Sequence, residues 1–483
     1  MNMKMMGRFI AQIIAIEAAF MIPAMFISVG YGEWPAVEAF AITIGAMLAL
    51  AGVLYLLCRK AGRLFGAREG LVCVALSWIV MSLLGALPFV LSGQVKNYVD
   101  ALFEIVSGFT TTGASVIADV EGLYRGVLYW RSFSHWVGGM GVLVFLLAVL
   151  PGSKGSGFTM HLLRAESPGP DVGKLVPKMR QTALILYLIY VALTVLNVIF
   201  LLVGNMPFLE ALCTAFGTAG TGGFGIYNTS MMAASPYLQN VTTVFMFLFG
   251  INFSCYYLLL IGKARSVFKD AELRLYIGLA LAAVVALVLS VRPLYDTLEE
   301  TIRHAAFQVS SIMTTTGYTT TDYDLWPSVS KGILLLLMIV GACAGSTGGG
   351  LKCMRVLLLF KTLRRNIRQI LNPQKVMVVR NNEKRVDEKI LDNTNAYLAA
   401  YVIIVVLTTL ILSIDGFSLE TNLSAALATF NNIGPGMALV GPTCTYAAYG
   451  VLSKLVMIVA MLAGRLEIFP ILVLFSRSTW KRN

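Results

Sequence analysis

Ser107-Gly108-Phe109-Thr110-Thr111-Thr112-Gly113-Ala114 is a polar stretch that follows a short apolar run, residues 101–106. That run is too short to cross a bilayer as a helix. The threonines and the glycine recur, after a similar run, in Ser310-Ser311-Ile312-Met313-Thr314-Thr315-Thr316-Gly317-Tyr318. Weaker copies are Phe216-Gly217-Thr218-Ala219-Gly220-Thr221-Gly222-Gly223 and Thr429-Phe430-Asn431-Asn432-Ile433-Gly434-Pro435. Each copy lies between two long hydrophobic segments, which predicts four helix pairs that each hold a half-length polar insertion.

The composition excludes a soluble enzyme. The 483 residues are 57% hydrophobic and only 13% charged. Apolar stretches of about 20 residues, the length that a helix needs to cross the hydrocarbon core, recur along the chain. The seven cysteines form no CxxC pair and no His/Cys cluster, so we interpret them as small buried hydrophobic residues. The sequence therefore predicts a polytopic helical membrane protein.

The net charge of +12 is distributed according to membrane topology rather than as a nucleic-acid-binding surface. If the long helices alternate in direction, the basic loops fall on one side and the acidic loops on the other. Basic loops face the cytoplasm, so we expect cytoplasmic N- and C-termini and all four polar turns on the outer side. The basic stretches are residues 4–8, 59–68, 154–180, 263–274, 352–389 and 477–482, and the acidic side includes Asp100, Asp119, Asp296, Asp324 and Asp415.

The predicted fold is an all-α polytopic membrane protein with four parallel helix–pore loop–helix repeats around a pseudo-four-fold pore. An N-terminal helix pair, residues 9–30 and 36–58, stands outside the repeats. All repeats enter the membrane in the same direction, which differs from the inverted repeats of many secondary transporters. The expected divisions are 1–65 for the helix pair, then 66–165, 166–268, 269–390 and 391–483 for the repeats. The flanking helices are expected at 71–92 and, as a separate helix, from Trp130 through Trp136 and Val142 to Leu150 in the first repeat. In the other repeats they are expected at 181–204 and 236–261; 274–291 and from 331 onward; and 395–414 and 449–475.

The polar turns have the chemistry of a cation pathway. Irregular backbone at membrane depth is tolerated only where protein buries it or a watery cavity adjoins it. Glycine permits backbone angles that direct successive carbonyl groups toward an axis, and the short helices would point their partially negative C-termini there. A ring of carbonyl groups can replace the hydration shell of K⁺. The alternative interpretation, that glycine and threonine only allow close helix packing, does not explain four copies in equivalent places.

Gly345-Ser346-Thr347-Gly348-Gly349-Gly350 interrupts the second helix of the third repeat, because glycines disfavour a helix interior. The functional interpretation is a loop below the filter that blocks the cavity and moves to open it; the alternative is a flexible kink. Arg465 lies in the last hydrophobic helix, and buried charges usually mark a pathway. We expect Arg465 to contact this loop as a positive barrier, unless it reaches lipid headgroups instead. Glu467 is a possible partner, although residues two apart on a helix do not face each other.

Trp130 and Trp136 suggest an interfacial aromatic belt, with Arg131 and His135 near the outer end of the same helix. His304, at the start of the third polar segment, is expected to cap a helix or pack at the pore mouth.

These motifs resemble the Trk/Ktr/HKT superfamily of K⁺ transporters, and within it the TrkH family, over nearly the whole chain. The resemblance also includes the stretch from Ala342 to Lys352. It implies one filter glycine in each repeat, with filter carbonyls from the residues just before it, and K⁺ as the transported ion. The implied filter residues are Thr111, Thr112 and Gly113; Gly220, Thr221 and Gly222; Thr315, Thr316 and Gly317; and Asn432, Ile433 and Gly434. Because no copy reads TVGYG, we expect weaker selectivity, with permeation of Rb⁺ and some Na⁺.

The resemblance further implies a gate at the glycine-rich loop, a homodimer in the bacterial inner membrane and a cytosolic TrkA-type regulatory subunit that binds nucleotide. The chain has no GxGxxG after a strand and no GK[ST] motif, so nucleotide control is assigned to that subunit. The basic stretch 361–368 is the expected contact for the subunit or for anionic membrane lipid.

Two other functions stay open on the sequence. One is an H⁺- or Na⁺-coupled K⁺ symporter that uses the filter as a binding site, for which only Glu17 and Glu467 are candidate intramembrane carboxylates. The other is a membrane enzyme, which the scattered histidines His135, His161 and His304 do not favour.

Overall fold

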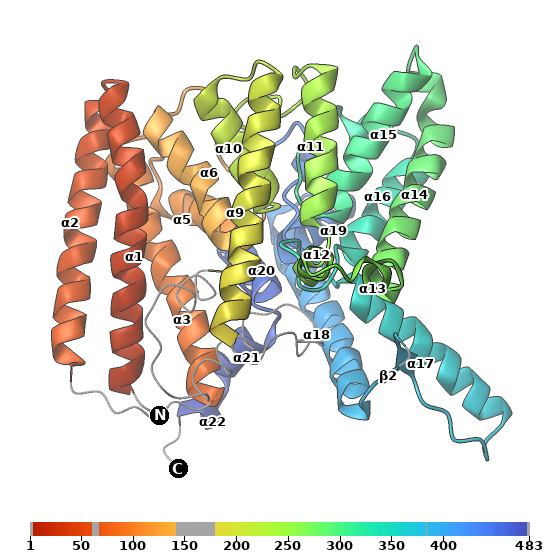
Figure 1. Cartoon of the computed structure of the whole chain (residues 1–483). Coiled ribbons are helices and arrows are strands. Elements are labelled where there is room, and N and C mark those ends of the chain that lie inside the picture. The colour runs from red at the N-terminus through yellow and green to blue at the C-terminus, as the bar shows by residue number, and fades with distance from the viewer. Residues whose placement is uncertain (1–2, 60–66, 142–178, 383, 481–483) are drawn as a thin grey trace.

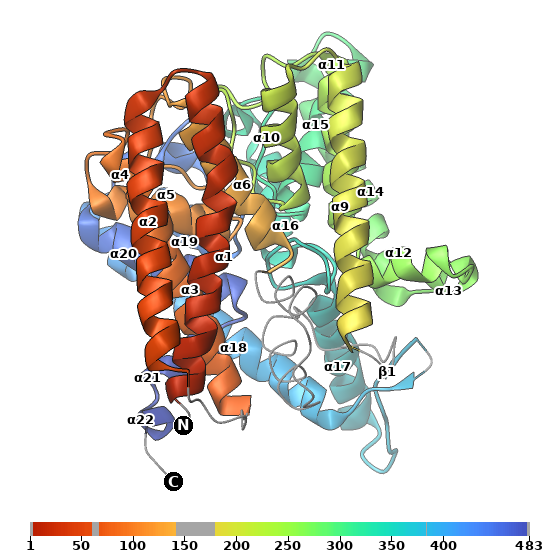
Figure 2. The ribbon, with the colours of Figure 1, turned by 60° about the vertical axis from the view of Figure 1, so that its left-hand side comes forward.

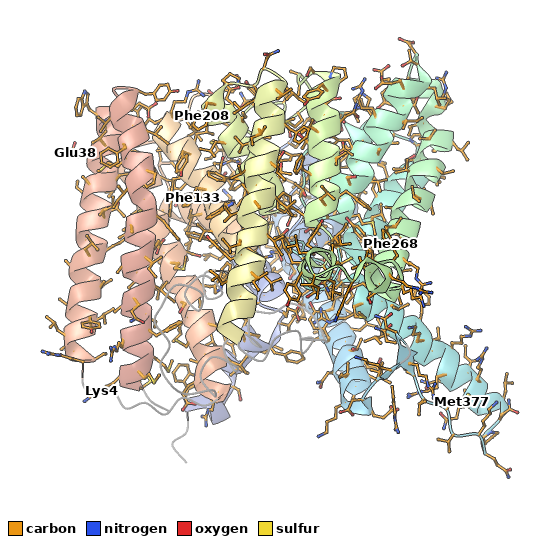
Figure 3. The ribbon with its side chains drawn as sticks, in the orientation of Figure 1. Lys4, Glu38, Phe133, Phe208, Phe268 and Met377 are labelled. Carbon is orange, nitrogen blue, oxygen red and sulfur yellow. The ribbon has the colours of Figure 1, made fainter. Side chains whose placement is uncertain are left out.

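The computed structural model describes residues 3–59, 67–141, 179–382 and 384–480. Most of these residues are helical, and among them only the two-residue strands β1 (Arg380–Asn381) and β2 (Lys384–Arg385) form a hairpin. Most helices run side by side, and α22 (Arg477–Trp480) lies at the same end as the start of α1 (Met3–Gly30) (Figure 1). Lys4 and Met377 lie toward this end, whereas Glu38 lies toward the other (Figure 3).

Six helices of the described residues are long and apolar enough to cross a membrane. Large apolar side chains such as Phe26, Leu289 and Leu410 project from them into the surroundings, with 64%, 75% and 61% of their surface exposed. A hydrocarbon environment suits such side chains, whereas water does not. The spans are Met3–Gly30, Trp34–Leu57, Arg68–Leu91, Ala183–Val203, Ala271–Leu294 and Glu388–Asp415. The predicted helical membrane fold is therefore confirmed.

The N-terminal pair, α1 and α2 (Trp34–Leu57), packs on the first helix–turn–helix unit. Its two helices stand beside each other at one edge of the molecule (Figures 1 and 2). Gly126 allows α6 (Arg125–Gly139) to approach α1 closely, because a Cβ atom there would lie 2.5 Å from the carbonyl oxygen of Ala24. The carboxylate of Glu33, between α1 and α2, accepts a hydrogen bond of 2.7 Å from the Arg125 amide at the start of α6. The pair is thus anchored to the rest of the chain at a helix N-terminus.

Four units follow, and each has the order long helix, short helix, polar turn, second helix. The short helices begin at side-chain caps in three units, where Asn97, Thr297 and Ser418 accept backbone amide hydrogen bonds. The units comprise α3 (Ala67–Gly85), α4 (Leu87–Leu91), α5 (Tyr98–Phe109) and α6 (Arg125–Gly139); α9 (Met179–Val203), α10 (Phe208–Ala219), α11 (Pro236–Phe249) and α12 (Phe253–Leu260); α14 (Ala271–Val291), α15 (Leu298–Met313), α16 (Ser328–Val340) and α17 (Cys353–Leu371); and α18 (Glu388–Leu412), α19 (Leu419–Phe430), α20 (Val451–Arg465) and α21 (Phe469–Phe475).

Several short elements connect these helices. They are α13 (Ala264–Phe268) and the 3-10 turns η1 (Arg292–Leu294), η2 (Tyr323–Leu325), η3 (Ser413–Asp415), η4 (Ala438–Val440) and η5 (Tyr446–Ala448).

Two predicted continuous helices are wrong because each is broken. The helix expected over 236–261 bends by 88° between α11 and α12, where a Cβ atom at Gly250 would lie 2.7 Å from the Thr314 side chain. The helix expected over 449–475 ends at Arg465, and Glu467 and Ile468 take positive φ angles of 57° and 66° before α21 begins. The remainder of the helix expected to reach Leu150 lies outside the described residues.

Candidate functional site

Each polar turn begins with the same backbone device at the end of a short helix. The second residue past the helix takes a left-handed conformation, and the third donates its amide to a carbonyl five residues back, as in a Schellman motif. The left-handed residues are Thr111, Thr221, Thr315 and Asn432, with φ of 54°, 52°, 60° and 57°. The five-residue hydrogen bonds are Thr112 to Ser107 at 2.8 Å, Gly222 to Gly217 at 2.8 Å, Thr316 to Ser311 at 2.8 Å and Ile433 to Ala428 at 2.9 Å.

Three of these left-handed residues are threonines, which is unusual because a β-branched side chain clashes in that conformation. Such strain persists only where surrounding contacts impose it. In the first turn, Thr110 and Thr112 share a hydrogen bond of 2.8 Å between their hydroxyl groups. In the third turn, Thr314 and Thr316 share one of 2.7 Å. The hydroxyl groups of these threonines therefore brace the turns from within the chain.

The four turns meet in a closed ring. In each turn, the residue that donates this amide hydrogen bond is followed by a glycine with positive φ. The Cα atom of that glycine lies so close to a carbonyl oxygen of the next turn that a Cβ atom would clash with it. The contacts run in order from Gly113 to the carbonyl of Gly222, from Gly223 to that of Thr316, from Gly317 to that of Ile433, and from Gly434 back to that of Thr112. Glycine is required at all four places because it lacks a side chain and tolerates φ of 71° to 97°.

This ring corrects the register predicted for the second turn. The sequence predicts Gly222 as the residue of the second turn that is equivalent to Gly113, Gly317 and Gly434. In the structure, Gly223 has the positive φ of 71° and makes the equivalent contact. The residue pair before the glycine is then Thr221 and Gly222, not Gly220 and Thr221. The sequence is ambiguous here because two glycines stand side by side, and only the contact with the third turn distinguishes them.

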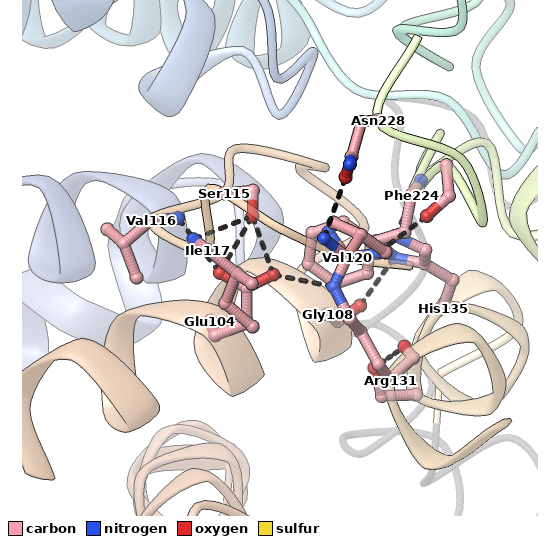
Figure 4. Close-up of polar contacts among 12 residues, drawn as sticks. Glu104, Gly108, Ser115, Val116, Ile117, Val120, Arg131, His135, Phe224 and Asn228 are labelled. Atoms are coloured by element: carbon pink, nitrogen blue, oxygen red, sulfur yellow. Dashed lines mark hydrogen bonds and ion pairs between the residues drawn. The ribbon is translucent and has the colours of Figure 1, made fainter. Parts of the chain in front are cut away.

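A buried ion pair supports the first two turns from behind (Figure 4). Glu104 on α5 and Arg131 on α6 are 0% and 2% exposed, and their Oε1 and Nε atoms lie 2.6 Å apart. The Glu104 carboxylate also accepts hydrogen bonds from the Ser115 hydroxyl at 2.9 Å and the Val116 amide at 3.0 Å. Arg131 donates to the Gly225 carbonyl at 2.9 Å. The Glu104–Arg131 pair thus holds the backbone just after Gly113 in the first turn and just after Gly223 in the second.

His135 lies one helical turn after Arg131 on α6 and connects the first and second polar stretches through Gly108 and Phe224. The Phe224 amide donates to its Nε2 at 3.3 Å, so Nδ1 carries the proton that is donated to the Gly108 carbonyl at 2.8 Å. Trp130 is buried as well and donates from Nε1 to the Gly85 carbonyl at 3.1 Å. The interfacial belt predicted for Trp130 is therefore wrong, because α6 is enclosed by α1, α5 and α10.

Tyrosine hydroxyl groups fasten the outer side of the turns. Tyr446 donates to the Gly434 carbonyl at 2.7 Å, and Tyr323 donates to the Gly436 carbonyl at 2.8 Å. His304 makes a hydrogen bond of 2.8 Å with Thr320 and stacks on Tyr295, so it packs at the mouth and does not cap a helix. At the same end, hydrogen bonds from Asn228 and Gly122 hold the pKa of the exposed Asp119 carboxyl below its usual range, which keeps it negatively charged.

The predicted interruption of the third unit is present as residues 341–352, here called the intramembrane segment, between α16 and α17. It lies against the inner side of the ring. The Gly349 amide donates to the Thr315 hydroxyl at 2.6 Å, and the Gly350 amide donates to the Asn431 carbonyl at 3.1 Å. The segment is irregular over a longer range than Gly345 to Gly350, because Gly341 and Lys352 also take positive φ angles, 71° and 77°.

Arg465 at the end of α20 contacts this segment, as the sequence predicts. Its guanidinium donates to the Thr347 carbonyl at 2.8 Å and also reaches the carbonyls of Gly138 and Gly139 at the end of α6. A second cation, Lys352, donates from Nζ to the Gly348 carbonyl. Glu467 forms an ion pair with Arg355, whose guanidinium lies 4.0 Å from the centre of the Tyr397 ring. Arg465, Arg355 and Glu467 therefore lie around the segment, and its own last residue, Lys352, adds a third positive group.

The TrkH family profile, described as a cation transport protein, matches residues 36–482. The chain belongs to the TrkH family. It is 34% identical over its full length to the Trk system potassium uptake protein TrkH of Salmonella typhimurium, and 33% identical to that of Halomonas elongata, with 100% of each chain covered. The crystal structure of the potassium transporter TrkH from Vibrio parahaemolyticus matches with a TM-score of 0.89, 28% identity and complete coverage of both chains. Membership confirms a transport protein rather than an enzyme.

In this TrkH-family chain, the structure brings together all four predicted turns, the glycine-rich loop and Arg465. Sequence reasoning missed the support residues Glu104 and Lys352 and assigned Arg131 and His135 only a position near the outer end. The available signal was charge: Glu104 stands between the apolar residues Phe103 and Ile105, and Arg131 directly follows the aromatic residue Trp130. Intramembrane charges need partners, but the pairing joins segments 27 residues apart, which no local pattern reveals.

Proposed function

We propose that this chain carries K⁺ into the cell through the ring of turns, which acts as a selectivity filter. The observation that supports this most directly is the closed order of contacts, in which each glycine faces the carbonyl of the following turn. Four equivalent turns in a closed ring bring backbone carbonyl oxygens together, and such oxygens can replace water around a monovalent cation. The names of the relatives, potassium uptake proteins, agree with K⁺ as the ion.

The proposed filter follows the register of the ring. Its carbonyls come from the left-handed residue and the residue after it in each turn, and its glycines follow them. These residues are Thr111, Thr112 and Gly113; Thr221, Gly222 and Gly223; Thr315, Thr316 and Gly317; and Asn432, Ile433 and Gly434. The absence of a TVGYG motif leads us to expect permeation of Rb⁺ and some Na⁺.

The intramembrane segment is the proposed gate, with its centre at Gly345, Ser346, Thr347, Gly348, Gly349 and Gly350. Its contacts with Thr315 and Asn431 put it next to the filter on the inner side. Arg465 holds Thr347 and adds positive charge to the same region, and positive charge opposes the entry of a cation. Opening would require the segment to leave these contacts.

The assembly is proposed to be a homodimer in the bacterial inner membrane, with cytoplasmic termini and a TrkA-type subunit that binds nucleotide. We retain the proposed divisions at 1–65, 66–165, 166–268, 269–390 and 391–483. The basic helix α17, which contains Arg364, Arg365 and Arg368, supports a cytosolic location, because it extends toward the same end of the molecule as Lys4 (Figures 1 and 3).

The test uses the purified full chain in liposomes loaded with K⁺ and no regulatory subunit. Uptake of ⁸⁶Rb⁺ driven by the K⁺ gradient should exceed that of protein-free liposomes, and Arg465→Ala should increase it. Arg364→Ala, which replaces an exposed arginine on α17, should leave uptake unchanged. Uptake equal to that of empty liposomes for both the wild type and Arg465→Ala would contradict the proposal.

A coupled symporter is the second candidate function, and the buried carboxylate of Glu17 is the observation that supports it. Among the described residues, Glu17 on α1 is fully enclosed, and neither carboxylate oxygen has a hydrogen-bond partner. The other candidate, Glu467, is paired with Arg355. Glu17 lies beside Gly85, whose other near neighbours are the Ile105 and Phe109 side chains of α5. An H⁺-coupled mechanism predicts that ⁸⁶Rb⁺ uptake under the K⁺ gradient changes when a pH gradient is added, whereas the channel predicts no such change.

A further inference from the structure

Glu272, near the start of α14, contacts both the intramembrane segment and the first turn of α17, which follows it. It is only 2% exposed. One carboxylate oxygen, Oε1, accepts a hydrogen bond of 2.6 Å from the Ala344 amide and another of 3.0 Å from the Met354 amide. Ala344 lies just before the glycine-rich loop, and Met354 lies in the first turn of α17. A single oxygen therefore ties the backbone just before the glycine-rich loop to the start of the helix that follows it.

This contact replaces a cap that α17 lacks. The residue before the helix, Lys352, has positive φ and makes no side-chain capping bond. The first amides of a helix need acceptors, and a carboxylate is favoured there by the helix dipole. Glu272 on α14 supplies both the hydrogen-bond acceptor and the negative charge at the N-terminus of α17. If the intramembrane segment moves away from the filter, at least one of these two hydrogen bonds has to break or rotate.

The N-terminus of α14 is itself held by the β1–β2 hairpin. The Asn382 side chain accepts a hydrogen bond of 2.9 Å from the Ala271 amide and donates one of 2.7 Å to Asp270. Asp270 caps α14 through the Leu273 amide at 2.9 Å. The hairpin is also attached to α17, because Lys361 donates to the Arg380 carbonyl at 3.0 Å. Asn382 and Glu272 thus act on the same two turns of α14.

We infer that Glu272 and Asn382 form a coupling path by which displacement of the hairpin strands β1 and β2, together with Asn382, at the cytosolic end loosens the intramembrane segment. Asn382 positions the N-terminus of α14, and Glu272 is the positioning residue that holds the gate in its blocking arrangement. This inference rests on the proposed gate. It adds a route of control that does not pass through Arg465, which holds the loop from α20 on the other side.

The test measures ⁸⁶Rb⁺ uptake by the full chain in liposomes without any partner protein. Glu272→Ala removes the acceptor and should raise uptake by about tenfold, an ordinary magnitude for coupling free energies. Glu272→Gln keeps a neutral acceptor and should fall between Glu272→Ala and the wild type. Asn382→Ala should also raise uptake. Matched controls are Glu38→Ala on α2 and Asn393→Ala on α18, both exposed, which should behave as wild type.

Two further readouts separate coupling from simple damage. The ratio of Rb⁺ to Na⁺ uptake should stay at the wild-type value, because the filter turns are untouched; a distorted protein would lose the ratio or the uptake. The double variant of Glu272→Ala and Asn382→Ala should match the larger single effect, since residues in one path are not additive.

The possible failures are distinguishable. If the wild type and Arg465→Ala conduct but Glu272→Ala and Asn382→Ala equal the wild type, the coupling path is wrong and the gate stands. Additive effects in the double variant, or reduced uptake with an altered ion ratio, would likewise overturn the path. If no variant conducts above empty liposomes, the proposed function itself fails, and the coupling path fails with it.

Discussion

At the scale of single residues, the site depends on backbone conformations that side chains resist. Thr111, Thr221 and Thr315 are β-branched and left-handed, which costs about 1–2 kcal/mol for each residue. They are followed by glycines that allow the next turn to approach within contact distance. The strain is stored where four backbones converge, which is the usual place for such outliers. Residue-scale predictions therefore concern the glycines and the groups that brace them.

Gly223→Ala should reduce ⁸⁶Rb⁺ uptake in liposomes by roughly tenfold, since a Cβ atom would clash with the Thr316 carbonyl in a strained conformation. Gly278→Ala on α14 is the matched control, because no atom lies within 4 Å of a Cβ atom at that position. Its uptake should equal that of the wild type. Wild-type uptake and ion preference in Gly223→Ala would mean that Gly223 is not part of the conducting ring.

Glu104→Gln should destabilise the protein by roughly 3 kcal/mol, because Arg131 would remain buried without a negative partner. The midpoint of thermal unfolding in detergent measures this loss. Glu299→Gln is the control: Glu299 also pairs with an arginine, Arg303, but it is 63% exposed, so its pair contributes little. A Glu104→Gln midpoint as high as that of Glu299→Gln would show that the buried pair is dispensable.

At the scale of elements, helices break where a neighbouring backbone or loop needs the space. The break between α11 and α12 is one case: the Phe253 amide donates to the Gly345 carbonyl at 3.0 Å, and the Asn252 side chain caps α12 through the Ser254 amide at 2.9 Å. A continuous helix would satisfy the Phe253 amide internally and leave the Gly345 carbonyl without this donor. The bend and the intramembrane segment therefore stabilise each other.

Asn252→Ala should lower the unfolding free energy by about 1 kcal/mol through loss of the α12 cap. Asn252→Ser, which keeps a capping oxygen, should recover most of that loss. Thermal unfolding in detergent compares the two variants with the wild type. Equal midpoints for the alanine and serine variants would argue that the cap has no role in holding the bend.

At the scale of the whole molecule, polar contacts close the circle of four units. Arg131 reaches Gly225 from the first unit to the second, Arg303 binds Gln239 between the third and the second, Lys331 lies 3.4 Å from Glu420 between the third and the fourth, and Lys454 lies 2.6 Å from Asp100 between the fourth and the first. Each contact joins a second helix of one unit to a short helix or turn of the next. The arrangement sets one end of the molecule apart as the mouth.

Orientation in the membrane is testable with cysteines that the chain already contains. Cys444 is exposed in the connection between η4 and η5, next to the acidic mouth, whereas Cys58 is partly exposed at the end of α2 and the remaining cysteines are buried. A membrane-impermeant maleimide should label Cys444 in intact cells, and Cys444→Ser should abolish that labelling. Labelling that appears only after the cells are opened would reverse the proposed orientation.

Much of the fold followed from local pattern. Segments of hydrophobic residues long enough to span a bilayer predicted the long helices, and runs such as 101–106, too short to span, predicted the short ones. Glycine-rich composition predicted the interruption at Gly345–Gly350, since glycine disfavours a helix whatever surrounds it, although the irregular segment already begins after Val340. Arg465 was found because a charge in an apolar helix requires a partner. These inferences succeed because desolvation and backbone entropy act on each segment separately.

Other features arose only when distant segments met. Gly223 rather than Gly222 occupies the ring because the third turn packs there. The bends after Phe249 and Arg465 follow from contacts with the intramembrane segment and with α6. The pairing of Glu104 with Arg131, and the two hydrogen bonds of Glu272, join atoms far apart in the chain. Local chemistry sets which groups cannot remain unpaired, but the partner of each group is chosen by packing, whose geometry no single segment contains.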